Sequence, residues 1–252
     1  MSHKTPSSLL SAEVLRGLHS LWSHALMALL RRDTIATSTM NDTELAQELQ
    51  RVSRLALGSA IAAPYGFVIL SAPSGGGKGT IGKELQTHGF SRLPRVTTRA
   101  PRPGEVDGID YIFLSRKRFT ALADAGAFLQ TAETHEELRG TLREEFRRLV
   151  RSEKPFYVEG SLGGYEQFLS HEEVRAAHPL SVFLLPPSFD VLAQRLGARS
   201  DDDMTPREFE GRLNKAIEHL RRANDLPYDV FYVNDIIPDV TGRILADFNP
   251  RR

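Results

Sequence analysis

A glycine-rich turn between an apolar strand and a helix constrains this chain more than any other feature. The turn follows an apolar run at 67–70, precedes a helical pattern at 80–88, and reads Ala72-Pro73-Ser74-Gly75-Gly76-Gly77-Lys78-Gly79-Thr80. Glycines let the backbone curl until successive N–H groups point at one anion, and the following helix adds its positive dipole end. Lys78 adds a mobile cation. The stretch therefore predicts a phosphate-binding loop, or P-loop.

The turn departs from the usual P-loop pattern at two positions. Ala72 stands where the pattern has its first glycine, and Gly79 stands where a Mg²⁺-binding hydroxyl is usual, with Thr80 one place later. The alternative is a flexible glycine turn. We favour the P-loop because glycine turns rarely carry a lysine directly before a helix. The predicted phosphate contacts are Ser74, Gly75, Gly76, Gly77, Lys78, Gly79 and Thr80.

The composition is that of an ordinary globular protein. The chain has 252 residues, of which 40% are hydrophobic, enough for one large domain or one domain with an appendage. The formal net charge is +0, so nothing indicates nucleic acid or an anionic membrane as a partner. The absence of cysteine excludes disulfides and thiolate sites and suits the cytoplasm. We expect neither a membrane span nor a secretory signal.

The first 60 residues predict two amphipathic helices. Apolar residues recur at spacings of three and four in two sets, which are Leu15, Leu18, Trp22, Ala25 and Leu29, and then Leu45, Leu49, Val52 and Ala56. An Asn41-x-x-Glu44 capping pattern opens the second set. We expect residues 1–60 to form a helical extension and residues 61–252 a second domain. The apolar stripes would pack on that domain or on each other; alternatively, they form a homodimer or bind another partner.

From residue 67 onward, strand and helix patterns alternate. Strands are predicted at 67–70, 111–113, 156–158, 180–185 and 231–233, and helices at 80–88, 115–124, from Thr141, from Ser170, at 188–196 and from Thr205. The starts at Thr141 and Ser170 rest on capping patterns, and helix 188–196 should stop at Gly197. The alternation predicts an α/β fold whose parallel sheet is covered by helices on both faces, with the ligand beyond the strand C-termini.

One segment carries a specific family resemblance. The sequence Val96-Thr97-Thr98-Arg99-Ala100-Pro101-Arg102-Pro103-Gly104-Glu105-Val106-Asp107-Gly108-Ile109-Asp110-Tyr111 resembles the nucleotide-monophosphate arm of guanylate kinases. Similar matches follow in the family's order at 183–188, Arg195, Arg199, Arg212 and 233–235, covering about residues 66–248. The resemblance implies a P-loop kinase with a small arm and a lid, which uses ATP and Mg²⁺. Its acceptor would be a nucleoside monophosphate, GMP by default.

The resemblance also implies roles for individual residues. Lys78 would follow the transferred phosphoryl group, and Arg195, Arg199 and Arg212 would neutralise its charge. Asn234 would lie near the adenine of ATP. Mg²⁺ would be carried mainly by phosphates and water, with Glu159 as an outer acid, because Gly79 offers no ligand.

The arm is also suited to an anion by its chemistry. Arg99 and Arg102 present planar forks, kept in place by prolines, that suit a phosphate dianion. Tyr111 could add a hydroxyl donor. Glu105 would fix an arginine or reach a sugar hydroxyl. A solvated basic loop is the alternative, and the upstream P-loop makes it the weaker one.

The predicted acceptor pocket departs from the family pattern. Gln130 replaces a glutamate, Ser161 an aspartate and Arg95 a serine, while Arg139 is new and Thr141 keeps a hydroxyl. A carboxylate accepts two hydrogen bonds, whereas an amide accepts with one end and donates with the other. The extra arginines leave open a different phosphorylated acceptor, such as a sugar phosphate. A non-catalytic binding module is the other alternative, although such scaffolds typically lose the P-loop.

Overall fold

The structure is a computed structural model that describes residues 5–30, 40–59, 65–134, 137–198 and 204–248. The chain divides into two compact units. The first comprises Met1–Ala62, Leu70–Ile81 and Ser181–Ile244, and the second Ala63–Ile69, Gly82–Leu180 and Leu245–Arg252. The boundary falls inside two strands, β1 (Phe67–Ser71) and β8 (Pro179–Leu185). The predicted division at residue 60 stays a prediction.

The main sheet has five strands in the order β2-β7-β1-β8-β9. The remaining strands are β2 (Ser91–Arg92), β7 (Phe156–Gly160) and β9 (Val230–Val233). The pairs β2–β7 and β8–β9 are parallel, and β1 is buried throughout. Continuous burial is typical of parallel strands covered on both faces. The predicted α/β fold is confirmed.

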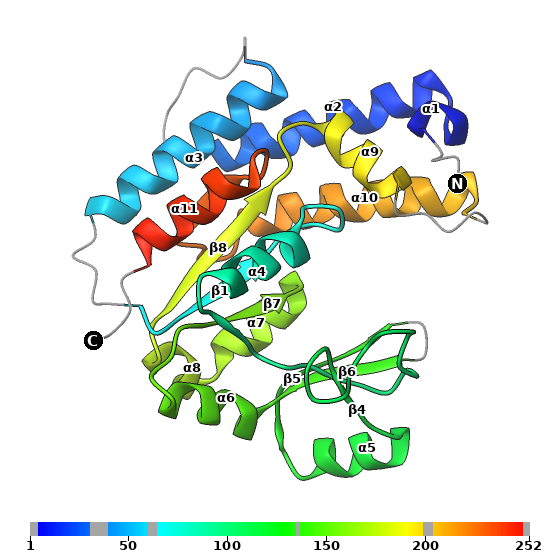
Figure 1. Cartoon of the computed structure of the whole chain (residues 1–252). Helices are drawn as coiled ribbons and strands as arrows, with labels where there is room; N and C mark the ends of the chain where they lie inside the picture. Colours follow the sequence, from blue (N-terminus) through cyan, green and yellow to red (C-terminus); the bar gives the residue numbers. More distant parts are fainter. Residues whose placement is uncertain (1–4, 31–39, 60–64, 135–136, 199–203, 249–252) are drawn as a thin grey trace. The chain divides into compact units, whose positions relative to one another are not determined.

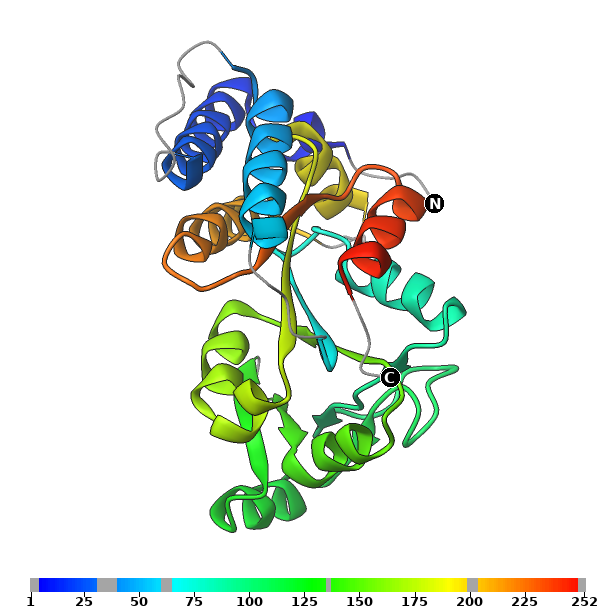
Figure 2. The ribbon, with the colours of Figure 1, turned by 90° about the vertical axis from the view of Figure 1, so that its left-hand side faces the viewer.

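The first unit carries the N-terminal helices. Its helices are α1 (Pro6–Leu9), α2 (Ala12–Leu30), α3 (Asp42–Ser59), the start of α4 (Lys78–Thr87), α9 (Phe189–Ala198), α10 (Pro206–Ala223) and most of α11 (Ile237–Asp247). Figures 1 and 2 show α2 beside α3 and α10, and α3 also packs against β9. Trp22 and Leu26 on α2 are fully buried. The apolar stripes therefore pack on each other and on the same chain, the first of the two alternatives.

Two of the predicted helix starts are confirmed by their capping boxes. Asn41 N donates to Glu44 at 2.8 Å, and Glu44 N donates to Asn41 Oδ1 at 3.0 Å. Thr205 and Glu208 make the same exchange at the start of α10. Each box satisfies N–H groups that lack a partner within the helix.

The second unit holds a four-stranded arm sheet in the order β4-β3-β6-β5. Its strands are β3 (Val96–Thr97), β4 (Ile112–Phe113), β5 (Phe128–Thr134) and β6 (Glu137–Leu142), and the unit's helices are α5 (Arg116–Asp124), α6 (Arg143–Arg151), α7 (Leu162–Ser170) and α8 (Glu172–Ala176). Val96, Phe119 and Phe128 form the core between one face of this sheet and α5. Thr97 and Thr141, which alternate with these apolar positions, belong to the opposite, polar face.

Three of the predicted helix boundaries are wrong. Thr141 lies inside β6 and α6 begins at Arg143, while Ser170 ends α7 and α8 begins at Glu172. In both cases pairing or packing with residues distant in sequence decides where the helix begins, and the local capping pattern does not. Helix α9 also continues through the buried Gly197 to Ala198. A glycine inside a helix costs only about 1 kcal/mol, which burial of the helix can offset.

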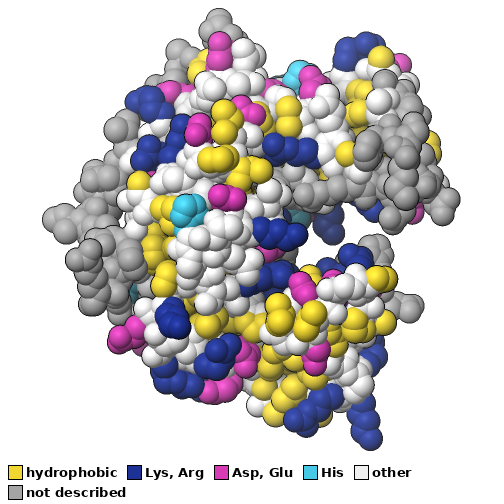
Figure 3. Space-filling model, in the orientation of Figure 1, with side chains coloured by type: hydrophobic (Ala, Val, Ile, Leu, Met, Phe, Trp, Pro, Cys, Tyr) yellow, Lys and Arg dark blue, Asp and Glu magenta, His cyan; other side chains and the backbone are white. Residues whose placement is uncertain are grey.

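Charged side chains of both signs are interspersed on the face shown in Figure 3. This distribution agrees with equal numbers of basic and acidic residues, 32 of each. Within the described ranges, every helix is too short or too polar to traverse a bilayer.

Candidate functional site

The glycine-rich turn lies between β1 and α4 in the first unit. Gly75 and Gly77 have φ values of 80° and 90°, in the left-handed region that glycine adopts without strain. Gly76 N donates to Pro73 O at 3.0 Å, which closes a tight turn. The first N–H groups of α4 have no acceptors one turn earlier in the helix, so they are suited to an anion. The geometry is that of the predicted P-loop.

Lys78 is the first residue of α4, and its amine lies over the loop. The Nζ atom donates to Ala72 O at 2.7 Å and approaches Pro73 O at 3.4 Å. These carbonyl groups keep the charge beside the loop. The positive charge of Lys78 also reaches His219 on α10, whose pKa falls to about 4, chiefly through burial and secondly through Lys78.

Asn234 connects three parts of the first unit directly after β9. It is 3% exposed, and its Nδ2 donates to Gly76 O at 2.8 Å. Its backbone N–H donates to Leu185 O at 2.7 Å, and its carbonyl oxygen accepts from Arg195 Nη2 at 2.9 Å. A Cβ on Gly77 would collide with the Asn234 amide, a second reason for glycine there. Sequence reasoning missed this contact with the P-loop, which no local pattern encodes.

The other predicted residues on this side are more exposed. Arg212 is exposed on α10, and Ser74, Gly79 and Thr80 are exposed on the loop and the first turn of α4. Arg199 lies outside the described residues. Of the three predicted lid arginines, Arg195 is connected to the P-loop through Asn234, because it donates to the Asn234 carbonyl oxygen.

In the second unit, Arg99 and Glu105 form a two-point ion pair. The guanidinium donates to both carboxylate oxygens, at 2.5 and 2.6 Å, and lies 5.0 Å from the centre of the Tyr111 ring. Glu105 also accepts from Arg102 N at 2.8 Å, while the Arg102 side chain is exposed. These contacts, Arg99 first, lower the pKa of Glu105 to about 2. Glu105 thus fixes an arginine, the first of its two predicted options.

The polar face of the arm sheet brings together Gln130 and Thr141. These residues are paired across β5 and β6, and both are buried. Gln130 Nε2 donates to Thr141 Oγ1 at 3.0 Å, while Gln130 Oε1 has no hydrogen-bond partner among the described residues. Ser161 caps α7, where its Oγ accepts from Gly164 N at 3.2 Å. A Cβ on Gly164 would lie 2.5 Å from Gln130 Oε1, so glycine leaves room for the amide.

Two arginines belong to the neighbouring part of the arm sheet, where β3 pairs with β6. Arg95 directly precedes β3 and is largely enclosed, and burial lowers its pKa. Arg139, two residues before Thr141 on β6, donates from Nη2 to Glu137 at 2.8 Å. Within the described part of the chain, the Nε atoms of both arginines are buried without a hydrogen-bond acceptor. Two buried donors are therefore left without an acceptor, which an anionic or carbonyl-rich ligand would supply.

Glu159 lies on β7, and its Oε1 is 3.5 Å from Arg92 Nε. Arg92, whose guanidinium is also 5.6 Å from the centre of the Tyr111 ring, was not predicted, because it lies outside the recognised motifs. Among the described residues, no three His, Asp or Glu side chains are grouped closely enough to bind a metal ion.

Comparisons with known proteins point to one family. A sequence model of the guanylate kinase family matches residues 66–247. The guanylate kinase of Trichormus variabilis is 38% identical over 177 residues, covering 67% of this chain and 82% of that protein. The guanylate kinase of a Mycobacterium species is 37% identical over 189 residues, covering 71% and 88%. A crystal structure of guanylate kinase from Anaplasma phagocytophilum has a TM-score of 0.55 and 25% identity, covering 73% of this chain and 85% of that one.

Proposed function

Because this chain belongs to the guanylate kinase family, we infer that it transfers the γ-phosphoryl group of ATP to GMP, giving GDP and ADP. The observation that carries the inference is the P-loop geometry around Gly75, Gly77 and Lys78 within a chain matched by the family over residues 66–247. Phosphoryl transfer requires alignment and charge compensation more than covalent help from protein.

We propose that the donor and the acceptor use different units of the chain. On the donor side, the N–H groups of the P-loop would bind phosphate oxygens, and Lys78 would leave its two carbonyl partners to follow the moving group. Arg195, Arg199 and Arg212 would neutralise charge in the transition state. On the acceptor side, Arg99, fixed by Glu105, would bind the GMP phosphate together with Arg102 and Tyr111.

The fit of the cofactors differs between ATP and Mg²⁺. Positive φ values and close packing at Gly77 support a loop that wraps a phosphate chain. Mg²⁺, which would neutralise charge on the phosphates, would be held mainly by phosphate oxygens and water, because Gly79 has no side-chain oxygen. Glu159 stays a proposed outer acid.

A coupled ADP-release assay tests the proposal directly. The full-length protein would be supplied with ATP and Mg²⁺ and with GMP, dGMP, AMP, UMP, CMP, dTMP or pentose phosphates. Turnover with GMP that is lost in Lys78→Ala is the expected result. Turnover only with another acceptor would favour a pocket with a different specificity, as Arg95 and Arg139 suggest. Tight ATP binding without turnover would favour a non-catalytic binding module. A homodimer through the N-terminal helices stays a prediction, which light scattering on the full chain tests.

A further inference from the structure

The edge of the main sheet is covered by a helix from outside the family-matched segment. β9 is the last strand in the sheet order, and its partner β8 lies on one side only. An edge strand presents unpaired N–H groups, which natural proteins protect from other chains. Here α3, which belongs to the N-terminal helices, packs along β9.

Two side chains of α3 accept the hydrogen bonds that a further strand would accept. Gln50 Oε1 accepts from Val233 N at 2.8 Å, and Ser53 Oγ accepts from Phe231 N at 3.1 Å. Ser53 Oγ also donates to Gln50 O at 3.0 Å, which orients the hydroxyl lone pairs towards β9. In a parallel strand alternate N–H groups point to opposite sides, so 231 and 233 face outward while Asn234 N bonds Leu185 on β8. Both outward N–H groups within β9 are therefore satisfied by α3.

The residue after Val233 is Asn234, which bonds the P-loop and Arg195. Fixing Val233 N fixes the direction in which the chain leaves the sheet. That direction determines whether Asn234 Nδ2 reaches Gly76 O, now 2.8 Å away, and whether its carbonyl meets Arg195. Covalent continuity thus joins Gln50 to the loop that would bind the phosphates of ATP.

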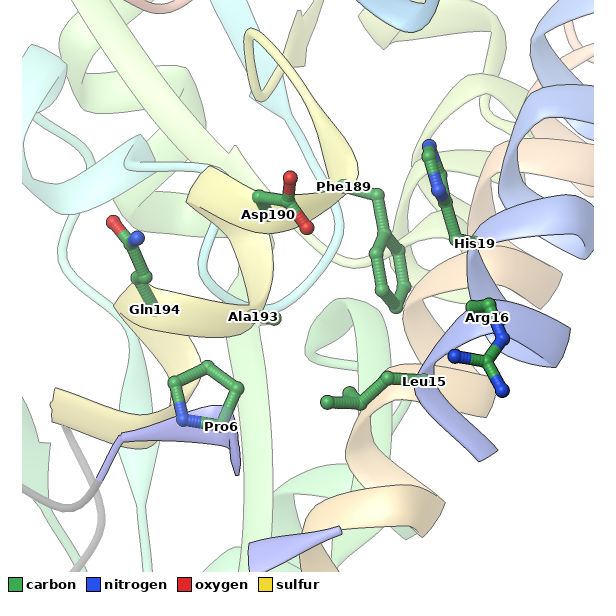
Figure 4. Close-up of a pocket in the computed structure, with 8 residues that line it drawn as sticks. All are labelled: Pro6, Leu15, Arg16, His19, Phe189, Asp190, Ala193 and Gln194. Atoms are coloured by element: carbon green, nitrogen blue, oxygen red, sulfur yellow. The ribbon is translucent and has the colours of Figure 1, made fainter. Parts of the chain in front are cut away.

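A second contact joins the N-terminal helices to the helix that carries Arg195. The rings of His19 on α2 and Phe189 at the start of α9 are stacked, with centroids 5.5 Å apart and planes 16° apart. Figure 4 shows the two rings side by side with Leu15 near them. His19 Nε2 is also 2.9 Å from Asp42 at the start of α3. The α2–α3 pair is therefore in contact with the elements on either side of the Asn234–Arg195 bond.

We propose that Gln50 and Ser53 are positioning residues for the ATP half of the site, acting through β9 and Asn234. The N-terminal helices would then help to position the ATP-binding residues, although they lie outside the segment that the family shares. Neither residue touches the reacting atoms. This inference depends on the proposed function in one respect, namely that the P-loop binds ATP.

The test compares Gln50→Ala and Ser53→Ala with two kinds of control in the full-length protein. Gln47→Ala removes the same side chain from an exposed position one turn earlier on α3. Gln50→Glu and Ser53→Thr keep an acceptor oxygen and should rescue. ATP affinity would be measured by calorimetry without acceptor, and KM for ATP and for GMP by ADP release, at a temperature where thermal unfolding curves show each variant folded.

The expected result is a weakening of ATP binding by about threefold to tenfold in Gln50→Ala, with KM for GMP unchanged. Ser53→Ala should act in the same direction, and Gln47→Ala should match wild type. Unchanged ATP affinity in Gln50→Ala, or an equal change in Gln47→Ala, would overturn the proposal. If Gln50→Ala does not fold, Ser53→Ala decides the question. The backbone amide NMR shifts of Gly76 and Gly77 in Ser53→Ala would be compared with those of the wild type. Shifts that match the wild type would refute the proposed link between α3 and the P-loop. Because calorimetry reads ATP alone, absence of GMP turnover would refute the proposed function and leave this test intact.

Discussion

Gln130 donates its amide N–H to Thr141 Oγ1 at 3.0 Å across two strands of the arm sheet, which leaves Gln130 Oε1 as a buried acceptor with no protein partner in the described chain. A single amide oxygen cannot face two neighbouring N–H donors with one oxygen each, as the two oxygens of a carboxylate can. Guanine offers two neighbouring N–H donors, N1–H and the 2-amino group, whereas hypoxanthine offers N1–H alone. If Gln130 faces the acceptor base, as we propose, it would therefore bind only part of the guanine edge.

We predict that wild-type enzyme separates GMP from IMP only weakly, by about tenfold or less in kcat/KM. Gln130→Glu supplies a second acceptor oxygen and should raise this ratio by about tenfold. Parallel assays of GMP and IMP with the wild type, Gln130→Glu and the exposed control Gln86→Glu would measure it. An unchanged GMP-to-IMP ratio in Gln130→Glu would contradict the assignment of Gln130 to the base.

Removal of Glu105 should weaken acceptor binding. Without the carboxylate, the Arg99 guanidinium loses both of its ion-pair hydrogen bonds and gains rotamer freedom, so it is no longer preorganised for a phosphate. We expect Glu105→Ala to raise KM for GMP by about tenfold while KM for ATP stays within about twofold. Steady-state kinetics in both substrates, with the exposed Asp124→Ala as control, checks this split. Equal rises in the two KM values would point instead to general unfolding.

The ion pair should also persist in acid. The pKa of Glu105 is lowered to about 2 from an ordinary value near 4.5, so the stabilisation is complete above about pH 4.5 and is lost as pH falls through about 2. We therefore expect no titration of acceptor binding from Glu105 between pH 5 and 8. GMP affinity in Glu105→Gln, measured across that range, should be lower than in wild type by a constant factor. A ratio that varies with pH in that range would argue against a permanently ionised Glu105.

His219 should make folding stability fall in mild acid. Its pKa is lowered from 6.5 to about 4 by burial, with Lys78, Lys215 and Arg222 acting in the same direction and Glu218 opposing them. Between pH 6.5 and 4 the unfolded chain binds a proton that the folded chain does not, so stability is full above 6.5 and decreases towards 4. Urea unfolding at pH 7 and pH 5 should show a smaller loss in His219→Gln than in wild type. The matched variant at the exposed His88, His88→Gln, should lose as much as wild type.

Deletion of residues 1–60 should destabilise the rest of the first unit. The deletion removes the cover of β9 and the buried residues of α2, Leu18, Trp22, Ala25, Leu26, Leu29 and Leu30. Each large apolar side chain contributes about 1.5–3 kcal/mol, so their sum is comparable with the whole stability of a typical domain, about 5–15 kcal/mol. We expect the truncated chain to aggregate through the uncovered edge. A soluble, monomeric product with a full thermal transition by light scattering and circular dichroism would contradict this prediction.

The sequence by itself determined the features that depend on neighbouring residues. The glycines and the lysine of the P-loop, the strand before it and the capping boxes at Asn41 and Thr205 all reappear in the structure, because turn conformation and helix capping are decided within a few residues. The arm motif also pointed to Arg99 and Glu105, since the two residues are close along the chain.

Only the tertiary structure decided the contacts made over long separations. Thr141 resembles a helix cap but lies in a strand, because pairing with Gln130 satisfies its backbone and side chain together. The bond between Asn234 and Gly76 spans 158 residues, and that between Gln50 and Val233 spans 183. Such pairs leave no periodicity or motif in the sequence. They form because burying the sheet edge and the P-loop requires a partner for each polar group, and the fold alone selects which residue supplies it.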